Sequence, residues 1–211
     1  MNYEDFDVVV PTHRKEKALK IIEDLKPIKV RHFDGTGYNS FSKLVNHVII
    51  SSDKEQIIWV SDKMVIKPVE VEKMMNLMND KFSLVCFHNF NFFGFKKQLI
   101  REVGFWDERF VGGEMSDCDF LRRVKLKNLA VYMSFESYKI QEGSSWHGGN
   151  VYAFYKQKWL ETDVCDYKLL PEETYKYDLG QSIECNWGTW EQSVYPEEHV
   201  KFYKLKKIES N

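Results

Sequence analysis

The sequence of 211 residues has few cysteines, no long apolar run and a net charge of only −2. Its four cysteines (Cys86, Cys118, Cys165 and Cys185) show no Cys-x-x-Cys spacing, so neither a zinc site nor a disulfide framework is predicted. No apolar run is long enough to cross a membrane, and the N-terminal residues lack a signal-peptide pattern. We therefore expect a cytoplasmic protein with reduced thiols and no membrane span.

Several common motifs are also absent. The low net charge gives no basic surface of the kind that binds nucleic acid. No Gly-x-x-x-x-Gly-Lys-Ser/Thr loop and no Gly-x-Ser-x-Gly elbow occurs, which argues against a P-loop enzyme and an α/β-hydrolase. The segment Asp34-Gly35-Thr36-Gly37 follows the second predicted strand, and no second such triplet accompanies it. It therefore does not indicate a methyltransferase or an aspartic protease.

Apolar strands and amphipathic helices alternate along the first half of the chain. The pattern predicts strands at 6–10, 28–33, 56–60 and 83–88, the first of them ended by Pro11, and helices at 14–26, 39–51 and 69–78. The methionines of the third helix are predicted to lie in the core. This alternation predicts an α/β fold with a parallel sheet and helices on both faces.

The second half is less regular. We expect a helix at 117–127, a strand near 129–135, a glycine-rich loop at 142–149 and a helix around 151–161. The whole of 1–211 is interpreted as a single domain. We divide it into residues 1–90, residues 91–161 and a C-terminal segment, 162–211, that wraps the core.

Ligands of open α/β sheets bind beyond the carboxyl ends of the strands. Here the predicted strand ends carry Pro11, Thr12, His13 and Arg14, then Asp34 and Tyr38, then Ser61, Asp62 and Lys63. Asp62 directly follows an apolar strand, a position from which a carboxylate can hold a divalent cation against a diphosphate. A turn or a helix cap would explain the same aspartate.

Two further features have open interpretations. His147, in the glycine-rich loop, could complete a metal site with Asp62 or be a solvated loop histidine. The aromatic residues Phe92, Phe93, Trp106 and Trp146 could form walls against which a sugar stacks, or fill the core.

Three carboxylates lie close together at 114–119. Ser116 and Asp119 match a capping box, and Asp119 also precedes Arg123 by the four residues of a helical ion pair. Asp117 would lie at the start of the helix, where the helix dipole favours its ionised form, so it could accept a proton. Glu114, beside Gly112-Gly113, is the alternative base.

Together these segments resemble the GT-A glycosyltransferases. The likeness covers about residues 6–150 and rests on Val10-Pro11-Thr12-His13, Asp34, Val60-Ser61-Asp62, Gly104-Phe105-Trp106-Asp107-Glu108-Arg109-Phe110, Ser116-Asp117-Cys118-Asp119-Phe120-Leu121-Arg122 and His147. Within the family, the chain is similar to transferase domains that glycosylate chlorella-virus capsids. In place of the family's Asp-x-Asp, only Asp62 is present, and Ser116 stands where the family has glutamate.

The resemblance implies a Rossmann-like fold with a mostly parallel sheet, in which residues 1–90 are the nucleotide-binding half and 91–161 the acceptor and catalytic half. It also implies transfer of a hexose or deoxyhexose from a UDP-sugar. The acceptor would be a glycan or glycoprotein hydroxyl, a viral capsid protein being one candidate, in host cytoplasm if the chain is viral. It implies that Pro11, Thr12, His13, Arg14, Asp34, Tyr38, Ser61 and Lys63 contact the nucleotide, that Asp62 and His147 bind Mn²⁺ or Mg²⁺, and that Asp117 or Glu114 acts in catalysis.

The stereochemistry of transfer stays open, because Asp117 would be the base of an inverting enzyme, whereas a retaining one needs a carboxylate on the other face of the sugar. Two other classes are considered. A binding module for nucleotide-sugars or glycans fits the missing acid of Asp-x-Asp. A sugar nucleotidyltransferase shares the architecture but would need a glycine-rich loop after the first strand, where this chain has Pro-Thr-His-Arg.

Overall fold

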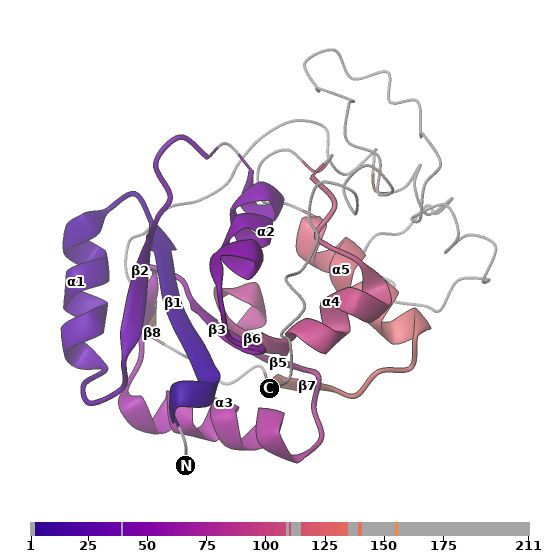
Figure 1. Ribbon diagram of the computed structural model, residues 1–211. Helices are drawn as coiled ribbons and strands as arrows, with labels where there is room; N and C mark the ends of the chain where they lie inside the picture. Colours follow the sequence, from indigo (N-terminus) through magenta and orange to yellow (C-terminus); the bar gives the residue numbers. More distant parts are fainter. Residues whose placement is uncertain are drawn as a thin grey trace. The chain divides into compact units, whose positions relative to one another are not determined.

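The computed structural model describes residues 3–38, 40–108, 110, 115–134, 139–140 and 155 (Figure 1). The chain divides into two compact units. The first consists of the described residues of 1–38, 52–102 and 128–145, and it holds the whole central sheet. The second consists of those of 39–51, 103–127 and 146–211, and it holds helices α2 and α5.

The first unit is a six-stranded sheet with the strand order β2-β1-β3-β6-β5-β7. The strands are β1 (Phe6–Thr12), β2 (Val30–Asp34), β3 (Gln56–Val60), β5 (Leu84–Phe87), β6 (Phe92–Lys96) and β7 (Val131–Ser134). The other elements are η1 (Tyr3–Asp5), α1 (Lys15–Asp24), α3 (Pro68–Asp80), η2 (Asn89–Asn91), α4 (Lys97–Val103) and a separate ribbon of β4 (Met64–Val65) with β8 (Lys139–Ile140). All strands of the sheet run parallel except β6. The predicted α/β class with a mostly parallel sheet is confirmed.

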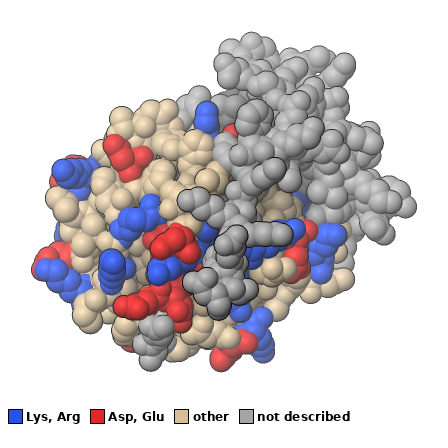
Figure 2. Space-filling view, in the orientation of Figure 1, with Lys and Arg blue, Asp and Glu red and all other residues tan. Residues whose placement is uncertain are grey.

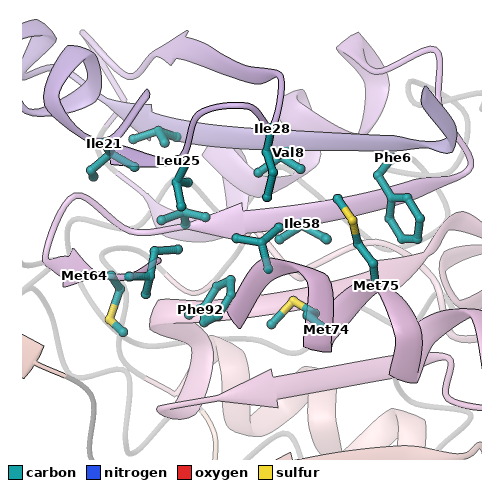
Figure 3. Packing of buried hydrophobic residues seen from close by; sticks show 14 of the residues in the cluster. Phe6, Val8, Ile21, Leu25, Ile28, Ile58, Met64, Met74, Met75 and Phe92 are labelled. Carbon is teal, nitrogen blue, oxygen red and sulfur yellow. The ribbon is translucent and has the colours of Figure 1, made fainter. Parts of the chain in front are cut away.

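Helices α1 and α3 pack on one face of this sheet, and α1 lies alongside β1 and β2 in Figure 1. Ile21 of α1, the C-cap residue Leu25, and Met74 and Met75 of α3 meet strand side chains such as Ile58 in a single buried cluster (Figure 3). Ile21 and Leu25 are four residues apart, and the buried residues of α3 recur at intervals of three or four (Val71, Met74, Met75 and Met78), so each set lies on one side of its helix. The predicted core position of the methionines is confirmed.

Strand β6 was not predicted, and it changes the interpretation of two aromatic residues. Phe92 and Phe93 are its first two residues, and both are fully buried. Phe92 belongs to the cluster under α3, while Phe93 stacks on Trp59 of the adjacent strand with ring centroids 5.7 Å apart. The suggestion that they stack on a sugar is therefore wrong, because successive strand residues fill the two faces of a sheet that is covered on both sides.

Gly94 of β6 lies where α3 approaches the sheet most closely. A Cβ atom built there would lie 2.5 Å from the Sδ of Met78 and 2.9 Å from that of Met74. We expect the Gly94→Ala variant to lose about 1–3 kcal/mol of unfolding free energy, since an added carbon overpacks a filled core. Urea denaturation measures this loss. Combining Gly94→Ala with Met78→Ala should recover part of it, whereas purely additive losses would contradict the overpacking explanation.

The boundaries of two elements have local causes. Strand β1 continues through Pro11 to Thr12, two residues beyond the predicted end. Pairing between β1 and β3 stops at Val9. Proline has no backbone N–H, but at Pro11 this costs no hydrogen bond to β3. Helix α3 begins at Pro68, whose fixed φ suits a first helical residue, and the Glu70 carboxylate accepts the backbone N–H of Lys67 at 2.5 Å.

The second unit contains α2 (Phe41–Ser51) and α5 (Ser116–Leu126). The buried Asn46 of α2 donates its amide to the carbonyl of Trp106 at 2.9 Å and accepts the N–H of Trp106 at 3.0 Å. Trp106 is itself fully buried and stacks on Phe120 of α5 with centroids 3.5 Å apart. A sugar-stacking role for Trp106 is therefore wrong, and Trp146 lies outside the described residues.

Two further observations concern the described residues as a whole. Among the described residues, no helix combines the length and the apolar character that crossing a membrane requires. On the face shown in Figure 2, the described lysines and arginines are interspersed with aspartates and glutamates.

The predicted helix around 151–161 and the glycine-rich loop at 142–149 lie outside the described residues, apart from Tyr155.

Candidate active site

The ends of β2, β1 and β3 meet at one edge of the sheet, and Thr12 connects them. Its hydroxyl donates a hydrogen bond to Oδ2 of Asp62 at 2.7 Å and accepts the backbone N–H of Arg14 at 3.0 Å. Its carbonyl accepts Nε2 of His32 at 2.8 Å and the N–H of Gly35 at 3.2 Å. Three of the predicted strand-end segments are thus brought together around one residue.

Asp62 lies two residues beyond β3 and is only 3% exposed. Its neighbours form a tight turn, because Ser61 accepts the N–H groups of Lys63 on its hydroxyl and of Met64 on its carbonyl. The N–H of Ser61 donates to the carbonyl of Asn91 at 2.8 Å. Asn91 belongs to η2, which follows β5, so the end of the fourth predicted strand reaches the same edge.

Asp34 ends β2 and is exposed. Its Oδ1 accepts both the N–H of Thr36 at 2.9 Å and the Thr36 hydroxyl at 2.6 Å. These hydrogen bonds hold the pKa of the Asp34 carboxyl below its ordinary value, so it is an ionised acceptor at neutral pH. The backbone is closely packed here, since a Cβ on Gly35 would lie 3.2 Å from the backbone carbon of Thr12.

The other residues predicted to contact a nucleotide differ in exposure. Pro11 is buried within β1, His13 is exposed, and Arg14 caps α1 with a half-buried side chain. Tyr38 is half-buried, and its ring meets that of Phe33 edge to face with centroids 6.1 Å apart. The edge therefore offers an ionised carboxylate, an aromatic pair and basic side chains within one unit.

Asp117 belongs to the second unit, near the start of α5. The capping box predicted with Ser116 is wrong. Met115 with φ 65° precedes the helix, no side chain caps it, and the N–H of Asp119 donates to the carbonyl of Met115. The Asp117 carboxylate accepts the N–H of Cys118 at 2.8 Å. Burial nevertheless raises the pKa of Asp117, whereas the helix dipole alone would lower it, because desolvation outweighs the hydrogen bond from Cys118.

Asp119 has the structural role that its spacing predicted. It is fully buried and pairs with the buried Arg123 one turn later, with Oδ2 lying 3.0 Å from Nη2 and 3.1 Å from Nε. Nη1 of Arg123 also donates to the carbonyl of Val103 at 2.6 Å. Arg123 therefore links α5 to Val103, while Asp119 balances its charge.

The predicted metal site is described only in part. Asp62 is described, but His147 is not, and Glu114 also lies outside the described residues. Among the residues that the structure describes, no group of three His, Cys, Asp or Glu side chains could hold a metal ion. The sequence analysis did not single out His32 and Asn91. The available signal for His32 was its position near the end of the second predicted strand, and its pairing with Val10 confirms that it lies near this edge.

No family model matches the chain, and no curated protein matches it either. Several solved structures do. Glucosyl-3-phosphoglycerate synthase from Mycobacterium tuberculosis, solved with Mn²⁺, UDP and glucosyl-3-phosphoglycerate, matches with a TM-score of 0.51 and 9% identity over 87% of this chain and 85% of that one. Drosophila β1,4-galactosyltransferase 7 with manganese, UDP-Gal and xylobiose matches with a TM-score of 0.47 and 13% identity over 71% and 73%.

A third match is the 1–349 fragment of TarS from S. aureus with UDP-GlcNAc, at a TM-score of 0.45 and 12% identity over 73% of this chain and 62% of that one. At these identities, the likeness concerns the fold. The chain has the GT-A type of fold that occurs in nucleotide-sugar transferases, as its sequence resemblance implied.

Proposed function

We propose that the protein is a metal-assisted glycosyltransferase that moves a hexose or deoxyhexose from a UDP-sugar to a hydroxyl of a glycan or glycoprotein. The observation that carries this proposal is the buried Asp62, held by Thr12 at the edge where β1, β2 and β3 end. That edge is where open α/β sheets bind ligands. We place the reaction in the cytoplasm; a viral capsid protein is one acceptor to test.

Asp62 fits a site for Mn²⁺ or Mg²⁺. Its carboxylate is a hard oxygen donor, and its hydrogen bond from Thr12 is the kind of support that metal-binding carboxylates receive. Mg²⁺-type sites often combine one or two protein carboxylates with phosphate oxygens of the substrate, so one aspartate is sufficient. His147 is proposed as a further ligand. A bound divalent cation would neutralise the charge that develops on the leaving diphosphate.

The nucleotide is proposed to lie along the same edge. Asp34, kept ionised by Thr36, can accept an N–H from the base. Tyr38 can supply an aromatic surface, and Lys63 and Arg14 can supply positive charge toward the diphosphate. His13 is proposed as a further contact of the nucleotide. UDP and Mn²⁺ are the first ligands to test, because the synthase that shares this fold was solved with both.

Asp117 is proposed as the base that takes the proton of the acceptor hydroxyl, with Glu114 as the alternative. A base with a raised pKa holds its proton more strongly after transfer, which favours proton abstraction at neutral pH. The configuration of the transferred sugar, read by NMR, distinguishes inversion from retention.

Titration of UDP with and without Mn²⁺, followed by calorimetry, tests the proposal. Mn²⁺ is expected to strengthen UDP binding to the wild type, and that gain should disappear in Asp62→Asn. Asp80→Asn is the matched control, because Asp80 is an exposed carboxylate at the far end of α3. An unchanged gain in Asp62→Asn would refute the metal role.

A donor panel then identifies the substrate. The donor that raises the melting temperature most is used in assays of UDP release with glycan acceptors. Slow, Mn²⁺-stimulated release of UDP supports a transferase. Binding of UDP-sugars without release of UDP from any donor would instead identify a binding module.

A further inference from the structure

We propose that Thr12 positions Asp62 and does not contact the nucleotide through its side chain. This inference rests on the proposed function, because it concerns how the carboxylate of the metal site is held. The two side chains lie 50 residues apart in the sequence and meet in a buried hydrogen bond of 2.7 Å. Thr12 is 4% exposed and Asp62 is 3% exposed.

The hydrogen bonds that the structure shows for Thr12 are all made to other groups of the protein. A hydroxyl has one hydrogen to donate, and in the structure the Thr12 hydroxyl donates it to Oδ2 of Asp62. The backbone N–H of Arg14 occupies an acceptor position of the same oxygen. The hydroxyl is therefore held from two sides and cannot turn toward a ligand without breaking a buried hydrogen bond.

The backbone of Thr12 is fixed as well. Its carbonyl oxygen accepts hydrogen bonds from His32 on β2 and from the N–H of Gly35 in the following turn. A Cβ on Gly35 would lie 3.2 Å from the carbonyl carbon of Thr12, so the turn is packed against it. The backbone of Thr12 is thus held in place by β2 and the turn after it, and the Thr12 hydroxyl in turn orients the carboxylate of Asp62.

This arrangement has a functional consequence. Outer partners of metal ligands orient the ligand, and their removal typically weakens metal binding about 10–100-fold. Thr12→Val removes the hydroxyl with little change in shape. We expect it to weaken Mn²⁺-dependent UDP binding by about 10–100-fold and to leave UDP affinity without Mn²⁺ unchanged. Thr12→Ser keeps the hydroxyl and should restore most of the Mn²⁺ dependence.

Thr36→Val provides a matched control. It also removes a threonine hydroxyl that donates to a carboxylate, in this case Asp34. If Asp34 contacts the base, Thr36→Val should lower UDP affinity equally with and without Mn²⁺. Thr12→Val and Thr36→Val therefore have different expected signatures in the same calorimetric titration.

The outcomes separate this inference from the proposed function. In the Asp62→Asn background, Thr12→Val should have no further effect on Mn²⁺-dependent binding, since the ligand that it positions has been replaced. Equal weakening with and without Mn²⁺ in Thr12→Val would make Thr12 a nucleotide contact and overturn the inference alone. An intact Mn²⁺ dependence in Asp62→Asn would overturn both. Thr12→Ala, which avoids the added methyl group, replaces Thr12→Val if circular dichroism shows that the valine variant does not fold.

Discussion

Replacing Asp117 with asparagine is expected to slow sugar transfer by about 10²–10⁴-fold while leaving UDP affinity unchanged, because general bases contribute factors of that size. Asparagine has the same shape and can still accept the N–H of Cys118, so the start of α5 should be preserved. Steady-state transfer rates with a saturating donor, together with calorimetric UDP titration, measure the two quantities separately.

The control for this prediction is Glu114→Gln, assayed in parallel. A near-normal rate for Asp117→Asn with a large loss for Glu114→Gln would assign the base to Glu114. Loss of UDP affinity in Asp117→Asn would instead assign Asp117 to binding.

The pH dependence of the transfer rate is expected to follow from the burial of Asp117. Desolvation raises the pKa of Asp117 above its ordinary value of 3.8, so the acidic limb of the rate profile should lie above the pH expected for an exposed aspartate. The folded state holds this proton more tightly than the unfolded chain, so the stabilisation it provides is full below 3.8 and is lost as the pH rises through the raised pKa. At pH 7, Asp117→Asn should therefore melt no lower than the wild type.

The Asp119→Asn variant is expected to lose about 3–5 kcal/mol of unfolding free energy, since it leaves the buried Arg123 without its paired carboxylate. Arg123 is 2% exposed and its Nη1 bonds the carbonyl of Val103, so the guanidinium cannot move into water without breaking that contact. Urea denaturation followed by circular dichroism measures the loss.

The chain contains a matched control for this prediction. Lys20 and Asp24 of α1 form an ion pair with the same four-residue spacing, but their side chains are 63% and 42% exposed. Asp24→Asn should change stability by at most about 0.5 kcal/mol, because water and salt screen an exposed pair. Equal effects of Asp24→Asn and Asp119→Asn would show that burial does not govern the strength of the Asp119–Arg123 pair.

The local sequence pattern was sufficient to predict part of the candidate site. Asp34 and Asp62 follow apolar segments, and the carboxyl ends of neighbouring parallel strands share an edge, so their placement could be predicted. The pairing of Asp119 with Arg123 could be predicted as well, because a helix brings residues four apart together whatever surrounds it. In each case the residues involved are close in sequence or belong to one periodic element.

The predictions that proved wrong depend on what surrounds a side chain in the folded protein. Phe93 and Trp106 are aromatic residues beside candidate site segments, yet each is buried by residues remote in the chain: Trp59 stacks on Phe93, and Asn46 holds the backbone of Trp106. The pKa of Asp117 was judged from its place in a helix, whereas burial decided it. Exposure and desolvation depend on neighbours that no local pattern contains.

By itself, the sequence determined the alternation of strands and helices, the α/β class and the strand ends that carry acids, because periodic burial and strand–turn chemistry act over a few residues. Only the tertiary structure decided that β6 runs antiparallel between β3 and β5, and that Thr12 is directed at Asp62. Strand order and buried hydrogen bonds depend on which distant segments pack together, and that choice is made by the free energy of the whole core.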